Sequence, residues 1–107
     1  MPQAIWLSWD LGVRGDYEGL YAWLDAHQAK ECGDSAAFLQ YEYAGSPRDA
    51  LATELRDQIT LSKETRIYVV WRDGDDGKLK GRFAIGGRKG APWSGYASLE
   101  SVDADGA

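Results

Sequence analysis

The chain has 107 residues, of which 44% are hydrophobic and 27% charged, and its net charge is −5. This composition excludes a disordered chain and fits one globular domain, and the longest apolar run is far shorter than the roughly 20 residues of a membrane-spanning helix. The single cysteine, Cys32, excludes an internal disulfide, and no secretory signal precedes the first apolar segment, so we expect a cytoplasmic protein without membrane contact.

Basic residues are concentrated in one part of the chain. Residues 63–89 contain eight Lys and Arg against four Asp and Glu, whereas the stretches on either side are acidic in balance. Nucleic-acid-binding domains usually carry a basic patch. In a chain of net negative charge, contact with nucleic acid would therefore depend on where these residues lie and not on the total charge.

The first predicted strand ends at Asp10 and is apolar on almost both sides. Its odd-numbered residues from Ile5 to Leu11 form one apolar face, and the other face carries Trp6. A strand of this kind is typical of the centre of a sheet that is covered on both faces. Gly12 then allows the chain to turn.

A helix is predicted from about Tyr17 to Ala29. Asp16 is suited to cap its N-terminus, and Gly33 lies just past its expected end, where glycine helps to terminate helices. The next segment, Ser35–Tyr43, alternates between a clean apolar face and a polar one, which indicates a strand with one solvated side. The sequence does not distinguish between a single strand and a short bent hairpin for this segment.

The second predicted helix runs from about Pro47 to Ile59. Ser46 is suited to cap it, and proline is favoured in the first helical turn. Leu51, Leu55 and Ile59 recur at a spacing of four residues. This spacing puts them on one face of the helix, which we expect to pack against the sheet.

Two more strands are predicted after this helix. Thr65–Trp71 is rich in β-branched and aromatic residues, and two Asp-Gly pairs predict a hairpin turn before the strand Lys78–Ile85. In that last strand we expect Leu79, Phe83 and Ile85 to face inward. Residues 98–107 are small and acidic, and we expect a flexible C-terminal tail there.

In this order, the elements predict one domain, residues 1–97, with an α+β fold: a two-layer sandwich with two helices on one face of a four- to five-stranded sheet. Trp6, Tyr68 and Val70 then fall on the face without helices. An exposed apolar patch of this kind is unusual in a soluble monomer. We therefore expect a homodimer that pairs this face about a two-fold axis, with Trp93 reaching over the partner.

Three short motifs invite comparison with known proteins: Trp9-Asp10 at the end of the first strand, Ser35 with Phe38 in the second, and Thr65–Tyr68 after the second helix. Their order resembles that of the small ferredoxin-like proteins that include the smaller subunit of the CRISPR spacer-acquisition complex and the VapD and GhoS toxin–antitoxin proteins. The resemblance implies a ferredoxin-like fold and a role in a toxin–antitoxin or defence system. It also implies a metal-binding nuclease residue, because the CRISPR members use the aspartate at this position.

Asp10 therefore has two interpretations. It is the candidate catalytic and metal-binding residue, and two copies in a dimer would share one divalent ion across the axis. The alternative is a turn carboxylate that accepts hydrogen bonds from backbone N–H groups near Gly12. Apart from this metal, the sequence predicts no cofactor, and it leaves open whether the protein is an enzyme.

A group of basic residues is the candidate nucleic-acid-binding site. These residues would follow a phosphate backbone while Trp93 or Tyr96 stacks on a base. The alternative is a solvated edge strand, on which lysines prevent unwanted strand pairing. The group consists of Lys78, Lys80, Arg82, Arg88 and Lys89.

Two functions remain as hypotheses. The first is a small dimeric binding or regulatory protein whose partner is a nucleic acid or another protein. The second is a metal-dependent nuclease that uses Asp10. The sequence shows no complete set of catalytic residues, which favours the first.

Overall fold

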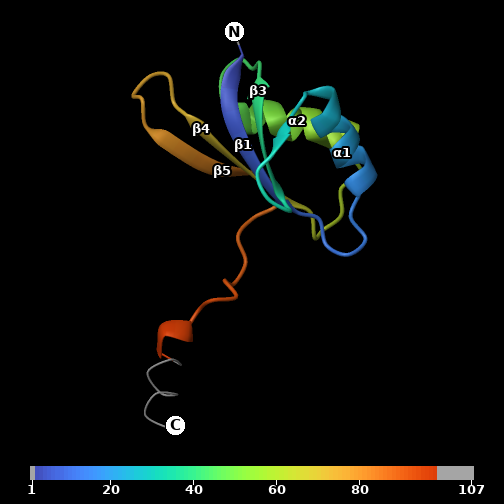
Figure 1. Ribbon diagram of the computed structural model, residues 1–107, viewed down its shortest axis with the longest axis vertical. Coiled ribbons are helices and arrows are strands. Elements are labelled where there is room, and N and C mark those ends of the chain that lie inside the picture. Colours follow the sequence, from blue (N-terminus) through green and yellow to red (C-terminus); the bar gives the residue numbers. More distant parts are fainter. Residues whose placement is uncertain (1, 99–107) are drawn as a thin grey trace.

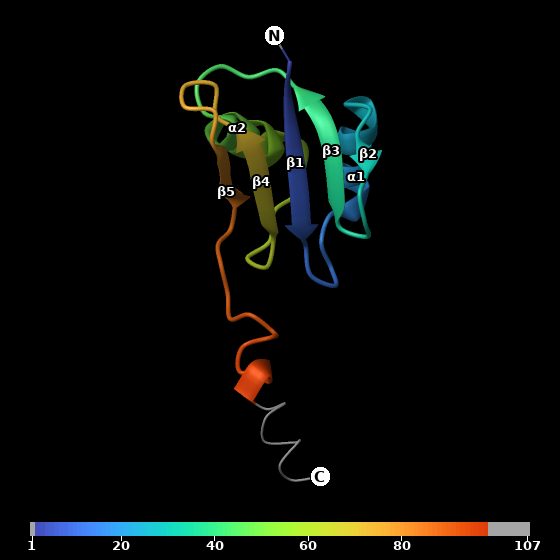
Figure 2. The same ribbon diagram turned by 60° about the vertical axis from the view of Figure 1, so that its left-hand side comes forward.

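The computed structural model describes residues 2–98 of the chain. It is an α+β fold in which five antiparallel strands form one sheet in the order β2-β3-β1-β4-β5. Helices α1 and α2 lie on the same side of this sheet (Figure 1; Figure 2). The elements are β1 (Gln3–Asp10), α1 (Tyr17–Ala26), β2 (Lys30–Glu31), β3 (Ala36–Tyr41), α2 (Pro47–Gln58), β4 (Arg66–Arg72) and β5 (Leu79–Ile85).

The hydrophobic core lies between the sheet and the two helices. Ile5 of β1 and Val69 of β4 are fully buried, and they belong to one cluster with Leu51, Leu55 and Ile59 from α2 and its C-terminal cap. The predicted inward face of the second helix is therefore confirmed. Among the described residues, no helix is long and apolar enough to cross a membrane.

The predicted caps of both helices are present. An oxygen of Asp16 accepts a hydrogen bond from the N–H of Gly19 at 2.9 Å, and the Ser46 hydroxyl accepts one from Asp49 at 3.4 Å. These bonds satisfy N–H groups that have no partner inside the first turn of a helix. Pro47 is the first residue of α2, as predicted.

The first helix is three residues shorter than predicted. Gln28 adopts a φ of 56°, and the N–H of Ala29 reaches back to the carbonyl of Leu24 at 3.0 Å. This arrangement is a Schellman-type helix end, which usually employs glycine at the left-handed position. Gly33, which we expected to help end the helix, lies instead between β2 and β3.

The segment predicted as Ser35–Tyr43 forms one strand, β3, and not a hairpin within itself. It does pair with β2, a strand of two residues that was not predicted from the sequence. Both residues of β2 are exposed. A strand this short and polar has no hydrophobic alternation, so periodicity could not reveal it.

The expected orientation of the last strand is wrong for two of its three residues. Leu79 is 62% exposed, and Phe83 lies opposite Tyr68 on the side without helices, while Ile85 faces the core as predicted. The cause is a β-bulge: the pairing between β4 and β5 skips Ala84. One extra residue reverses the alternation of side chains along the rest of the strand.

We call the side of the sheet without helices the open face. Trp6 lies opposite Phe38 and Val70, and Tyr68 lies opposite Ser8. The prediction that Trp6, Tyr68 and Val70 share this face is therefore confirmed. The other strand residues of the open face include Asp10, Gln40, Arg66, Arg72 and Phe83.

After β5 the chain leaves the sheet as an arm, residues 87–98 (Figure 1). Within the arm, backbone hydrogen bonds join Ser94 to Ala91 and Tyr96 to Trp93, each at 3.1 Å. The predicted tail, residues 98–107, lies outside the described residues except for its first residue.

Candidate functional site on the open face

Four aromatic side chains stand on the open face, one from each of the neighbouring strands β3, β1, β4 and β5. We call Phe38, Trp6, Tyr68 and Phe83 the aromatic platform. The rings of Trp6 and Phe38 are 5.2 Å apart between centroids, and those of Tyr68 and Phe83 are 4.9 Å apart. Trp6 is 42% exposed, and the other three are partly exposed. The platform therefore presents ring faces and edges to solvent.

Gly81 provides the space for one ring of this platform. A Cβ atom at this position would lie 2.8 Å from two ring carbons of Tyr68, which is closer than side chains normally approach. The absence of a side chain lets the Tyr68 ring lean over β5 toward Phe83. The bulge at Ala84 completes the arrangement, because it turns Phe83 to the open face.

A charged cluster adjoins the platform where β1 ends and β4 begins. The Arg66 guanidinium donates a hydrogen bond to Oδ2 of Asp10 at 2.7 Å, and the Lys89 ammonium lies 3.6 Å from the same oxygen. The N–H of Gly12 donates to the other carboxylate oxygen, Oδ1, at 3.1 Å. The hydrogen bond from Arg66, with that from Gly12, lowers the pKa of Asp10. Asp10 therefore carries a negative charge at neutral pH.

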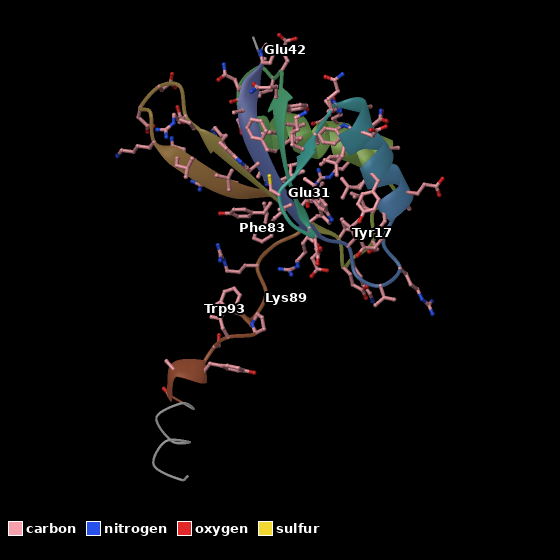
Figure 3. The ribbon with its side chains drawn as sticks, in the orientation of Figure 1. Tyr17, Glu31, Glu42, Phe83, Lys89 and Trp93 are labelled. Atoms are coloured by element: carbon pink, nitrogen blue, oxygen red, sulfur yellow. The ribbon has the colours of Figure 1, made fainter. Side chains whose placement is uncertain are left out.

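A shallow hollow of about 470 Å³ connects the platform to the charged cluster. Arg88 and Trp93 of the arm form one wall of it, and Figure 3 shows Lys89 and Trp93 on the arm, below the lower end of the sheet. Trp93 is 73% exposed. The hollow is lined by Ser8, Trp9, Asp10, Arg66, Tyr68, Phe83, Arg88 and Trp93.

The contacts of Asp10 match the turn-carboxylate interpretation, because one of its oxygens accepts the N–H of Gly12. Its other oxygen is engaged by Arg66. Within residues 2–98, no three His, Cys, Asp or Glu side chains are grouped so that they could hold a metal ion. A metal at Asp10 would therefore need ligands from a second copy and the displacement of Arg66.

The structure separates the predicted basic residues into two groups. Lys80 lies opposite Trp71, on the side of the helices, and its ammonium is 2.6 Å from Asp73 and 3.3 Å from Asp76. Arg82 faces the same side, opposite Val69, and Lys78 precedes β5 in the hairpin turn.

The second group, Arg88 and Lys89, lies at the hollow on the open face. The five residues do not form one continuous stripe. Only this second group is near the aromatic platform.

Three members of this site, Phe38, Arg66 and Phe83, were not among the site residues predicted from the sequence. The signal for Arg66 was present, since it alternates with Tyr68 and Val70 in a predicted strand and must share their face. No comparable signal existed for Phe83, because its orientation depends on the bulge.

The open face is locally basic although the chain is acidic. Its strand residues and the start of the arm provide five cations and one carboxylate, Asp10. This balance contrasts with the net charge of −5 for the whole chain. The cations are Lys30, Arg66, Arg72, Arg88 and Lys89.

Comparison with protein-family models, with curated proteins and with solved structures finds no match to this chain.

Proposed function

We propose that the protein is a non-catalytic binding protein that holds single-stranded nucleic acid on its open face. The aromatic platform carries this proposal, because four partly exposed rings across four adjacent strands lie next to the cations Arg66, Arg88 and Lys89. Unpaired bases stack on aromatic side chains, and basic residues contact the phosphates. A duplex hides its base faces, so the platform fits a single strand.

The position of the cations supports this assignment. Arg88 and Lys89 flank the hollow beside Tyr68 and Phe83, so bases stacked on the rings would bring phosphates to the charged cluster. Arg66 is held by Asp10 through one nitrogen, and a guanidinium has five N–H donors. The pair therefore orients Arg66 and leaves donors for a phosphate oxygen.

The homodimer predicted from Trp6, Tyr68, Val70 and Trp93 is the competing use of this face. Pairing two copies face to face would bury the same rings, but it would also bring two locally basic surfaces together. Like charges across an interface oppose association. The charge of the open face therefore favours an anionic partner over a second copy.

A ferredoxin-like arrangement is part of the proposal. The element order β-α-β-β-α-β is typical of ferredoxin-like folds, and here β1 to β4 with the two helices follow that order. The strand order β2-β3-β1-β4 keeps β1 central, and β5 adds an outer strand. In this arrangement the helices cover one face and leave the other available for a ligand.

The test is a titration of fluorescently labelled single-stranded DNA and RNA twelve-mers, followed by anisotropy at several salt concentrations. We expect binding that weakens as salt increases. Phe38→Ala should lower the affinity by about 5- to 150-fold, which corresponds to the roughly 1–3 kcal/mol of one base–aromatic stack. Tyr21→Ala is the control, since Tyr21 is an exposed aromatic on α1, away from the open face.

Two results would contradict the proposal. In the first, the oligonucleotides do not bind at low salt, the wild type is a dimer at micromolar concentration, and Tyr68→Glu dissociates this dimer. That result would assign the open face to self-association. The other is cleavage of the oligonucleotide that requires a divalent metal and disappears in Asp10→Asn. That result would establish the nuclease alternative.

A further inference from the structure

The aromatic platform consists of two separate pairs of rings. The first pair is Trp6 with Phe38, on β1 and β3, and the second pair is Tyr68 with Phe83, on β4 and β5. Within residues 2–98, no ring contact joins one pair to the other. The platform therefore offers two distinct places to a ligand and not one continuous surface.

The two rings of each pair are too close and too inclined to serve two bases. Their centroids are 5.2 Å apart in the first pair and 4.9 Å apart in the second, which is less than the width of a base that lies flat. Their planes meet at 54° and 75°, so a base can stack parallel to only one ring of a pair. The other ring then meets the base with its edge, a contact that aromatic rings also favour. Each pair therefore holds one base.

The spacing of the two pairs fits neighbouring bases that are separated from each other. Trp6 lies opposite Val70, and Tyr68 precedes Val70 by two residues on the same strand, so Trp6 and Tyr68 are diagonal neighbours. Diagonal neighbours in an antiparallel sheet lie about 7–8 Å apart, whereas neighbouring bases along a duplex strand repeat at about 3.4 Å. Two neighbouring bases can therefore reach both pairs only if they unstack, which a single strand allows more easily than a duplex.

Gly81 sets the position of the Tyr68 ring in the second pair. A Cβ atom on Gly81 would lie 2.8 Å from two carbons of that ring, so the ring occupies the space of the missing side chain. The backbone of Gly81 has no positive φ, and residues other than glycine adopt such a strand conformation without strain. An alanine here would therefore displace the Tyr68 ring and leave the strand intact.

Each pair has a cation at its outer side. Lys30 lies opposite Phe38 at the edge of the sheet, and Arg88 lines the hollow with Tyr68 and Phe83. Neither cation forms an ion pair with another described residue. Basic residues beside stacking rings are the usual contacts of the phosphates in a bound single strand. The two cations therefore mark the ends of a path that crosses the strands over both pairs.

Given the single-strand binding proposed above, on which this step rests, we propose that the open face receives two adjacent, unstacked bases, one on each ring pair. The backbone of the nucleic acid runs across the sheet from Lys30 toward Arg88, so that the two flanking phosphates lie at these cations. Gly81 is a positioning residue, because it places the Tyr68 ring against the second base.

The first test uses the wild type and fluorescently labelled DNA six-mers whose backbone is abasic except for one to four adjacent thymines. A second thymine should raise the affinity by about fivefold or more, which is the lower end of one base–aromatic stack. A third and a fourth thymine should each add no more than about twofold, because the platform has only two ring pairs. A steady increase through four thymines, or no increase at the second, overturns the proposal.

A double-mutant cycle with the single-stranded twelve-mers tests how the rings are paired. Across the pairs, Trp6→Ala combined with Phe83→Ala should reduce the affinity by the product of the two single losses, to within about twofold. Within the first pair, Trp6→Ala combined with Phe38→Ala should lose little more than the larger single loss, because both rings serve one base. Independent losses within the first pair contradict the proposal.

Gly81→Ala tests the positioning role. It should lower the affinity for the twelve-mers by about fivefold or more and cause no further loss in the Tyr68→Ala background. The control is Gly74→Ala in the hairpin turn, where an added Cβ would meet no atom within 4 Å. Unchanged affinity in Gly81→Ala, or an undiminished loss in the Tyr68→Ala background, overturns this role.

Failure of the two-base arrangement is distinguishable from failure of the open-face function. Salt-dependent binding of the twelve-mers with no gain from a second thymine contradicts the two-base arrangement alone. The absence of all binding at low salt contradicts the single-strand function and, with it, the two-base arrangement.

Discussion

The two faces of the sheet use the same strands for different purposes. On the face covered by the helices, Ile5, Leu39 and Val69 are at most 1% exposed and touch apolar residues. On the open face, their neighbours Trp6 and Tyr68 keep contact with water and lie among cations. Alternate residues of one strand can therefore be assigned to stability and to recognition, and substitutions on the two faces should have separable effects.

The largest expected effect is on the covered face. Leu55 is fully buried in α2, so Leu55→Ala should lower the free energy of unfolding by about 2–5 kcal/mol through lost burial and the cavity left behind. Urea denaturation measures this change, with Val13→Ala at a 97% exposed position as the control. A change within about 0.5 kcal/mol would show that this side chain is not part of the core.

On the open face, the effect should appear in binding more than in stability. Trp6→Ala removes one ring of the platform and should weaken oligonucleotide binding by about 1–3 kcal/mol. Its cost in stability should be smaller, about 0.5–1.5 kcal/mol for the lost ring pair plus some partly exposed area. Anisotropy measures the loss of oligonucleotide affinity, and urea denaturation of the same sample measures the loss of stability. An unfolded variant would mean that the open face is structural.

The two groups of basic residues provide a sharper comparison within the last part of the chain. Changing Arg88 and Lys89 to Ala should reduce the slope of log affinity against log salt by about 1.4, which corresponds to two phosphate contacts on a single strand. Changing Lys78 and Arg82 to Ala should leave the slope almost unchanged, because Arg82 faces the helices and Lys78 lies in the hairpin turn. The reverse result would place the nucleic acid along β5.

The smallest expected effect concerns the charge of Asp10. Its pKa is lowered in the folded state by Arg66 and Gly12, so its contribution to stability is present above about pH 4 and is lost as the pH falls through the folded-state pKa. The Asp10 side chain is 44% exposed, so solvent screening keeps this contribution near the low end of about 0.2–1 kcal/mol. The stability difference between wild type and Asp10→Asn should therefore shrink from pH 7 to pH 3.

Binding should change in the opposite direction in the same variant. Removing the only carboxylate among the open-face strand residues increases the positive charge of the face, so Asp10→Asn should bind oligonucleotides more tightly than wild type at low salt. Weaker binding that appears only with a divalent metal would instead indicate that Asp10 is a metal ligand.

Regular patterns made the central part of the fold predictable. Alternation in β1 and β4 placed Trp6, Tyr68 and Val70 on one face, and the spacing of Leu51 and Leu55 identified the buried side of α2. These predictions succeeded because each depends on a repeat within one element.

The remaining features depend on contacts between elements. Gln28 ends α1 in a backbone conformation that is rare outside glycine, and Ala84 forms a bulge visible only in the pairing of β4 with β5. For the same reason, the site was only half predictable. Asp10 was recognised as a residue of interest, but its partner Arg66 lies 56 positions away in the sequence.

The edges of the sheet have a consequence for how the protein behaves in concentrated solution. At one edge, β2 pairs with only two residues of β3, so this edge consists of β2 and the short remainder of β3; the other edge is β5, which is interrupted by a bulge. Long, flat edge strands are the usual templates on which folded chains add to one another and begin to form fibrils. Neither edge provides such a template, so the folded protein should tolerate expression and storage at high concentration without forming amyloid-like aggregates.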